Sequence, residues 1–210
     1  MDNNLSTEEK ILQAAQEVFI REGYDGARMQ HIADKAGINK ALLHYYYRSK
    51  EKLFLEVFEK VFTGLLQQIF TLVESEQSLE KFLKVFFREH IGFLLKDPRL
   101  PAFIISEISL NPGLISVVFK KIHGQGIRRF SEMLKREKEK GTVDPAVDAR
   151  QVLINILSLS IFPVSIHPVI GGILGLSEEE TGDFIRQRME ILPAMVMASV
   201  QKDKNKNQQK

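Results

Sequence analysis

The sequence predicts an all-α protein, and three observations support this. Apolar residues recur at helical spacing along most of the 210 residues, and there is no alternating strand pattern of useful length. The first of the seven prolines is Pro98, so no proline interrupts a long helix in the N-terminal half. With 44% hydrophobic and 27% charged residues, the composition is that of an ordinary globular protein with a buried core.

The first expected helix covers residues 7–22. Ser6-Thr-Glu-Glu9 has the form of a capping box, in which the serine and the last glutamate satisfy each other's backbone N–H groups at a helix start. The segment Gly23-Tyr24-Asp25-Gly26 is expected to form a turn after the helix. The residues expected on the buried face are Ile11, Ala15, Val18 and Phe19.

Residues 28–53 carry the most informative pattern in the chain. One apolar face of a short helix is formed by Met29, Ile32, Ala33 and Ala36, which recur at i, i+3, i+4 and i+7. Gly37 supplies the left-handed residue that ends this helix, and Asn39 is a good N-cap for the next one. Two helices joined by a short turn that contains glycine form a helix-turn-helix, whose second helix usually enters the major groove of DNA.

Positive charge is concentrated on this motif, although the whole chain has a net charge of only +2. Residues 1–25 carry two cations against six acids, whereas residues 26–50 carry five cations against one acid. The helices expected to begin near Arg28, Lys40 and Lys50 each have a cation in the first turn, where the helix dipole disfavours it. Such helix starts suit phosphate binding. The alternative is that these residues are simply good helix formers on a solvent-exposed surface.

The rest of the chain is also predicted to be helical. Ser49 is expected to cap a long helix with an apolar stripe over residues 53–65, and a second stripe runs over 79–94 in a helix that ends before Pro98. A short apolar helix at 100–110 and one or two helices over 112–140 follow. Asp144-Pro145 predicts a further helix start, and Ser177-Glu-Glu-Glu180 is a capping box for the last helix.

Residues 152–176 contain no Asp, Glu, Lys or Arg. The run is long enough for a membrane span, but Asn155, Pro163 and the lack of a basic anchor close to its C-terminal end argue against one. An apolar helix broken at Pro163, and buried against the core and a partner subunit, is the preferred interpretation. We therefore expect a two-fold homodimer interface in the 152–200 region.

The helix-turn-helix region resembles the DNA-binding domain of the TetR/AcrR family of bacterial transcriptional regulators. The matching residues, in register and without a gap, are Ile32-Ala33, Ala36-Gly37-Ile38, Leu43, Tyr46-Tyr47 and Ser49-Lys50-Glu51-x-Leu53. The chain departs from the family pattern at Ala27-Arg28, at Ala41 and at His44-Tyr45. The resemblance implies a DNA-binding domain over 1–50 and a helical effector-binding and dimerisation domain over 51–200. The polar tail 201–210 is expected to be disordered.

The resemblance and the pattern together suggest individual roles. Lys40 is expected to reach guanine O6/N7 or a phosphate, and Ala41 and Leu42 a thymine methyl group. The phosphate contacts are assigned to Arg28, His44, Tyr45 and Lys50, and Gln30 could take either role. Leu43, Tyr46 and Tyr47 are expected to pack inward against the first helix, in preference to the alternative of stacking on nucleic acid. The full set of expected DNA-binding residues is Arg28, Gln30, Asn39, Lys40, Ala41, Leu42, His44, Tyr45 and Lys50.

By the same resemblance, the C-terminal domain would bind a small-molecule effector that shifts the two DNA-binding heads out of register. The chain has fourteen phenylalanines, which could line an apolar pocket or could simply form the core. His90 and His167 could equally be core or surface histidines, and Glu107 could face water. The expected pocket residues are Phe62, Phe86, His90, Phe103, Glu107, Phe119, Phe162 and His167.

The sequence contains no recognisable catalytic motif. It has no His-Glu-x-x-His, no Walker loop and no Gly-x-Ser-x-Gly elbow, and the five histidines lack metal-ligand spacing. We therefore expect no enzyme activity, no metal and no cofactor. The absence of cysteine and of a secretory signal favours a cytoplasmic protein.

The predicted function is a ligand-responsive transcriptional regulator that binds double-stranded DNA as a dimer. Repression rather than activation is implied by the resemblance alone. The main alternative is a helical small-molecule-binding module without DNA activity, and it predicts no salt-dependent affinity for duplex DNA.

Overall fold

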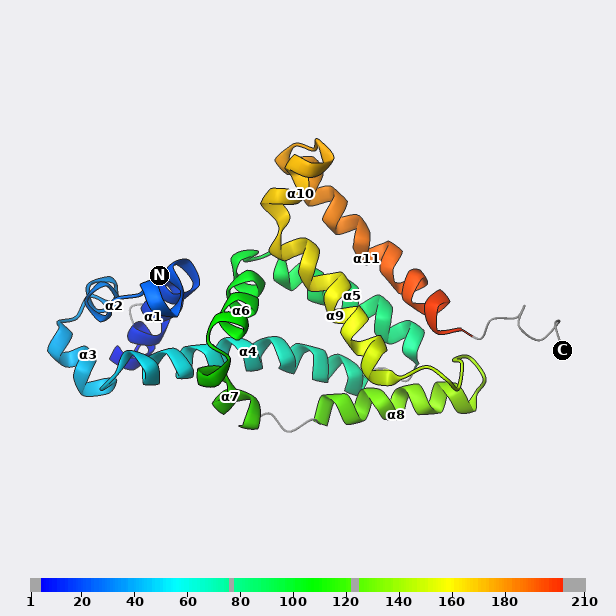
Figure 1. Cartoon of the computed structure of the whole chain (residues 1–210), viewed down its shortest axis with the longest axis horizontal. Helices are drawn as coiled ribbons and strands as arrows, with labels where there is room; N and C mark the ends of the chain where they lie inside the picture. Colours follow the sequence, from blue (N-terminus) through cyan, green and yellow to red (C-terminus); the bar gives the residue numbers. More distant parts are fainter. Residues whose placement is uncertain (1–4, 76–77, 122–124, 202–210) are drawn as a thin grey trace. The chain divides into compact units, whose positions relative to one another are not determined.

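The computed structural model describes residues 5–75, 78–121 and 125–201, with the side chains of 66–75, 119, 121, 125 and 126 excepted. Within these ranges the chain forms helices and no strand, so the predicted all-α fold is confirmed (Figure 1). The helices are α1 (Thr7–Gly26), α2 (Met29–Ala36), α3 (Lys40–Tyr46), α4 (Lys50–Ser75), α5 (Leu79–Leu94), α6 (Arg99–Leu110), α7 (Pro112–Lys121), α8 (Gln125–Glu139), α9 (Ala149–Ser165), α10 (His167–Leu174) and α11 (Glu178–Val200).

These helices form two compact units. The first contains the chain up to Leu65 together with Arg99–His123, and the second contains Leu66–Pro98 together with everything after His123. The first unit thus combines the helix-turn-helix with α6 and α7, whereas the sequence suggested a DNA-binding domain of residues 1–50 alone. Helix α6 packs against α1 within this unit, which a boundary at residue 50 does not anticipate.

The core of the first unit is built on α1 and the N-terminal half of α4. The predicted inner face of α1 is confirmed, since Ile11, Ala15, Val18 and Phe19 are all buried. Phe54 from α4 is the centre of an aromatic cluster, with ring centroids 5.1 Å from Phe19, 4.8 Å from Tyr24 and 6.2 Å from Phe103 of α6. Edge-on and tilted ring contacts of this kind add to the area that they bury.

The N-terminal helix is longer than predicted and contains a break. The capping box at Ser6 is present, as expected. Gly23, however, has non-helical φ and ψ of 68° and 177°, and helical structure resumes as far as Gly26. This combination of angles is almost restricted to glycine, so the residue type permits the break.

The second unit is formed by α5, α8, α9, α10 and α11, with α5 packed extensively on α11. The apolar stripe predicted for α5 is buried, and it includes Leu79, Phe82, Phe86 and His90. The capping box predicted at Ser177 is also present at the start of α11. In Figure 1, α10 lies where α9 ends and α11 begins, and it contacts both helices.

Two predicted boundaries in this unit are wrong. Asp144 does not cap a helix: its Oδ1 accepts the N–H of Ala146 at 2.8 Å in a turn, and α9 begins later with Asp148 as its N-cap. Lys138 Nζ holds that turn by donating to the carbonyls of Pro145 at 2.9 Å and Val147 at 2.5 Å.

Pro163 does not break the apolar segment, because α9 continues through it to Ser165. The break comes at Ile166, and α9 and α10 are bent by 78° there. Pro168 in the first turn of α10 accounts for this position, since it has no N–H to donate to the carbonyl of Val164 and its ring suits the first turn of a new helix.

Among the described residues, no single helix is long and apolar enough to cross a membrane. In the described ranges, two bent helix pairs, α6 with the first part of α7 and α9 with α10, reach that length and composition together.

Candidate DNA-binding surface

The turn between α2 and α3 has the local geometry that the sequence predicted. Gly37 adopts left-handed angles of φ 70° and ψ 30°, and its N–H donates to the carbonyls of Ala33 and Asp34. Asn39 then caps α3, accepting the N–H of Leu42 on its Oδ1 at 2.8 Å. The two short helices are therefore held in a helix-turn-helix by a glycine C-cap and an asparagine N-cap.

Helix α3 presents nearly all of its side chains to solvent. Leu43 is its buried anchor, and Tyr47, directly after the helix, is buried as well. Tyr47 donates its hydroxyl hydrogen bond to Glu56 at 3.0 Å, and burial is the first cause that raises its pKa. Because so few residues anchor α3, most of its side chains are free to contact another molecule.

The inward packing predicted for Tyr46 is wrong. Its side chain is 40% exposed, and it makes an edge-on contact with Tyr45, which is 81% exposed, at a centroid distance of 5.6 Å. The buried position one turn after Leu43 is taken by Tyr47 at i+4 rather than by Tyr46 at i+3. Tyr46 therefore joins the outer face of α3.

Eight of the nine residues expected to bind DNA lie on the exposed surface around the motif. Gln30 is held by a hydrogen bond from its Nε2 to Asp34 Oδ1 at 2.7 Å, and Arg28 occupies the N-cap of α2. The exposed members are Arg28, Gln30, Asn39, Lys40, Ala41, Leu42, His44 and Tyr45.

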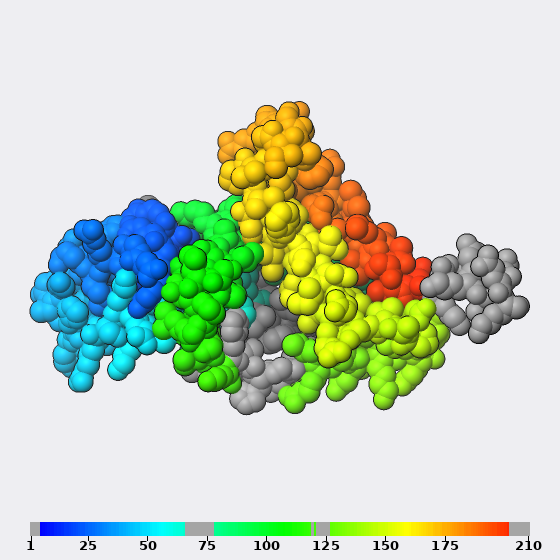
Figure 2. All heavy atoms as spheres, viewed as in Figure 1, coloured from blue at the N-terminus to red at the C-terminus, as the bar shows by residue number. Residues whose placement is uncertain are grey.

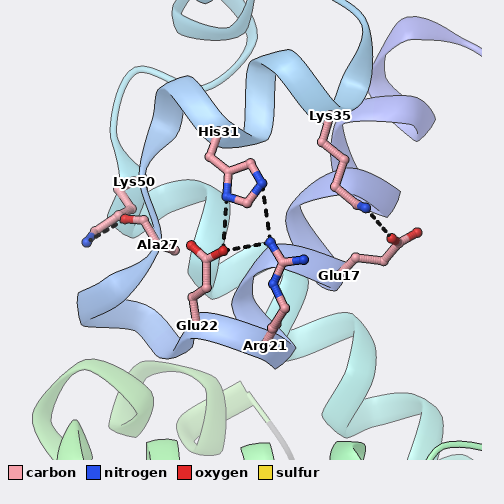
Figure 3. A network of polar contacts seen from close by, with 7 residues as sticks. All are labelled: Glu17, Arg21, Glu22, Ala27, His31, Lys35 and Lys50. Carbon is pink, nitrogen blue, oxygen red and sulfur yellow. Dashed lines mark hydrogen bonds and ion pairs between the residues drawn. The ribbon is translucent and has the colours of Figure 1, made fainter.

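Lys50, the ninth expected residue, is half-buried and already has protein partners. Its Nζ donates to the carbonyls of Asp25 and Ala27, both at 3.3 Å, and lies 4.6 Å from the centre of the Tyr24 ring. The ammonium has three donors, so one remains for a phosphate while the other two hold the end of α1 to the start of α4. Figure 3 shows Lys50 beside Ala27.

Ion pairs tie α2 to α1 on the neighbouring side (Figure 3). Glu22 Oε1 lies 2.7 Å from Arg21 Nη2 and 3.0 Å from His31 Nδ1, and Lys35 Nζ lies 2.7 Å from Glu17 Oε2. The hydrogen bond from Arg21, followed by that from His31, lowers the pKa of the Glu22 carboxyl. His31 and Lys35 are therefore engaged in holding α2.

Arg48 and Tyr46, which were not in the expected set, are also exposed at the helix-turn-helix. Arg48 is exposed between α3 and α4, and among the described residues it has no ion-pair partner. Arg48 is one of the five cations in residues 26–50, so the concentration of positive charge there could have identified it from the sequence.

Replacement of Lys50 by alanine is expected to weaken binding to all duplexes similarly and to lower the slope of log affinity against log salt by about 1. The reason is the loss of one phosphate contact. The measurement is a salt titration of duplex affinity, with Lys60→Ala as the control because Lys60 is an exposed cation farther along the same helix. An unchanged slope would leave Lys50 only the structural role of holding the end of α1.

The expected effector-pocket residues are distributed over both units. Phe62, Phe103 and Glu107 belong to the first unit, where Phe103 is buried against Phe54 and Phe58. The second unit contains Phe86, His90, Phe162 and His167, while the side chain of Phe119 lies outside the described residues. Phe86 and His90 are buried and stacked with ring centroids 4.8 Å apart, whereas Phe162 is 59% exposed.

The second unit also has a groove of about 570 Å³ between α5 and α11, which none of the expected pocket residues lines. Its lining residues are Glu80, Lys84, Arg88, Met189, Glu190, Pro193, Ala194, Met197, Ala198 and Gln201. In the described part of the chain, no cluster of His, Asp or Glu side chains could hold a metal ion.

An exposed, capped helix behind a glycine turn, with cations around it in an all-α chain, defines a helix-turn-helix DNA-binding protein. Residues 11–57 match the family model described as bacterial regulatory proteins, tetR family. The chain belongs to the TetR/AcrR family of bacterial transcriptional regulators.

Relatives agree with this assignment. The chain is 26% identical to the transcriptional repressor NicS of Pseudomonas putida over 74% of both proteins. It is 35% identical to the transcriptional activator FasR of Mycolicibacterium smegmatis over 40% of this chain and 42% of that protein.

Among solved structures, the fatty acid degradation regulator FadR of Bacillus halodurans has the same fold. Its TM-score is 0.67 at 20% identity, covering 93% of this chain and 97% of that one. FadR of Bacillus subtilis, solved in complex with stearoyl-CoA, has a TM-score of 0.60 at 16% identity, over 86% and 96% of the two chains.

Proposed function

We propose that this protein is a ligand-responsive transcriptional repressor, which binds a palindromic DNA operator as a homodimer and is released by a small apolar effector. The observation that carries the DNA-binding part is helix α3, whose side chains other than Leu43 face solvent behind a fixed turn. Expected base contacts come from Lys40, Ala41 and Leu42, with phosphate contacts from Arg28, His44 and Tyr45. The similarity to the repressor NicS favours repression. The similarity to the activator FasR makes activation the alternative to be tested.

The homodimer is proposed to form through α9, α10 and α11, as the 152–200 prediction suggested. These helices carry an apolar face that is open in the single chain, and the outer sides of α9 and α10 are on view in Figure 2. Large exposed apolar groups of this kind mark interfaces, and a second copy of the chain would cover them. The exposed members are Ile154, Phe162, Val169, Ile173, Leu174, Phe184, Ile191 and Met195.

The effector is proposed to bind in the second unit near α5. His90 supports this, because both of its ring nitrogens are buried without a hydrogen-bond partner, and a polar atom of a ligand would satisfy one of them. Phe86 stacks on the His90 ring and gives the same place an apolar wall. A long-chain acyl-CoA is the first effector to try, since a protein of this fold, FadR of Bacillus subtilis, has been solved with stearoyl-CoA.

The proposed function is tested by selecting bound duplexes from a random DNA pool and following the affinity of the selected duplexes against salt. Recovery of a palindromic site with a steep salt dependence is the expected result. Stearoyl-CoA is then titrated into the complex, with free coenzyme A as the control. No enrichment, and no affinity at low salt, would overturn the DNA-binding proposal and leave a helical ligand-binding protein.

A further inference from the structure

The break in α1 is joined to α6 by a single buried carboxylate. Gly23 interrupts the helix, and the N–H of Tyr24 donates to Glu107 Oε1 at 2.8 Å. In an uninterrupted helix, this N–H would donate to the carbonyl four residues earlier. Glu107 therefore supplies an acceptor at a place where the α1 backbone departs from helical geometry.

The Glu107 side chain is buried and held at both carboxylate oxygens. It is 2% exposed, and its second oxygen accepts a hydrogen bond from Asn111 Nδ2 at 2.8 Å. Buried carboxylate oxygens need hydrogen-bond donors, so losing the Tyr24 contact would leave Glu107 Oε1 buried without its donor. A Cβ on residue 23 would lie 3.1 Å from Glu107 Oε1, so the glycine also permits this close approach.

The same short segment is also held by α4. Lys50 Nζ donates to the carbonyls of Asp25 and Ala27 and lies over the ring of Tyr24. Ala27 is buried directly before Arg28, the N-cap of α2. Residues 23–27, which we call the α1 junction, thus connect Glu107 of α6 with two residues expected to contact phosphates, Lys50 and Arg28.

We infer that Glu107 is a positioning residue for DNA binding, through which α6 fixes the α1 junction and with it Lys50 and the start of α2. Withdrawal of the carboxylate releases the N–H of Tyr24 and loosens the support of both cations. Reciprocity then requires that DNA binding strengthens the Glu107–Tyr24 contact. This inference rests on the proposed DNA-binding function, and it gives Glu107 a role outside the effector pocket.

The test compares Glu107→Ala with Glu107→Gln on the duplex selected from the random pool. The alanine variant is expected to bind at least tenfold more weakly with an unchanged salt slope, since no phosphate contact is deleted. The glutamine variant retains an oxygen acceptor, and the Asn111 amide can turn to pair with it, so affinity within threefold of the original is expected. Hydrogen exchange of the Tyr24 amide is expected to be faster in the alanine variant, and slower in the original protein when DNA is bound.

Glu137→Ala is the matched control, because Glu137 is a buried glutamate of the second unit that is paired with Lys140 and Thr142. It is expected to reduce stability and leave duplex affinity unchanged. If Glu107→Ala does not fold, Asn111→Ala replaces it, with the same expected direction for affinity and for Tyr24 exchange.

A folded Glu107→Ala protein with the original affinity, or unchanged Tyr24 exchange, would overturn this inference alone. The same holds for Asn111→Ala if it is the variant used. Failure of the unmodified protein to bind any duplex would instead overturn the proposed function, and this inference with it.

Discussion

Replacement of Ile191 by glutamate is expected to convert the dimer into a monomer and to weaken operator binding by roughly 10²–10⁴-fold. Ile191 is 59% exposed in the single chain and lies on α11 between Phe184 and Met195. These residues are spaced i, i+7 and i+11, so they share one side of the helix. A carboxylate in the centre of this apolar stripe would lose its hydration on association without gaining a partner.

The affinity falls with the dimer because a palindromic site is bound by two heads at once. In a dimer, the second head binds its half-site at a high effective concentration, and a monomer loses this advantage without losing any contact of its own. Sedimentation at micromolar protein and duplex affinity measured on the same preparation would test both effects.

Ile127→Glu is the control for this substitution. Ile127 lies on α8, is 49% exposed and is outside the proposed interface, so the same change there is expected to leave the dimer and its affinity intact. An Ile191→Glu protein that still sediments as a dimer would remove α11 from the proposed interface.

Acid is expected to destabilise the protein by about 3 kcal/mol through His90 as the pH falls from 6.5 to 4. Burial lowers the pKa of His90 from 6.5 to about 4, because the charged imidazolium would be desolvated. Between these values the unfolded chain binds a proton that the folded chain does not. The stability contributed by neutral His90 is therefore complete above pH 6.5 and is lost as the pH falls.

Urea unfolding at pH 7.5 and pH 4, for the original protein and for His90→Leu, measures this effect. Leucine removes the titrating group and two unpaired buried nitrogens, so the variant is expected to be less sensitive to acid. It is also expected to be more stable at neutral pH by about 1–3 kcal/mol, the usual cost of an unsatisfied buried polar group. The exposed His44 provides the control, since His44→Ala should keep the acid sensitivity of the original. Equal sensitivity in His90→Leu and the original would show that other groups cause it.

Much of the candidate DNA-binding surface could be predicted from the sequence, because its signals are local. Gly37 as a helix end, Asn39 as the next cap and the capping boxes at Ser6 and Ser177 depend on residues within four positions. The inner face of α1 depends on helical periodicity in the same way. The prediction was wrong where two similar signals lie close together. The N-cap of α9 is Asp148 and not Asp144, and the break in the apolar segment lies beside Pro168 and not at Pro163.

The helical fold, the helix-turn-helix and the positive charge around it could all be predicted from the sequence. Caps, turns and periodicity are fixed by neighbours along the chain. Two contacts depend instead on how the helices pack: Glu107 accepts the N–H of Tyr24, a residue 83 positions away, and Lys50 holds the end of α1. Packing also leaves Tyr46 facing solvent, because Leu43 and Tyr47, four residues apart, occupy the buried positions. A long-range hydrogen bond or the choice of a buried face depends on which helices pack together, and no local pattern records this.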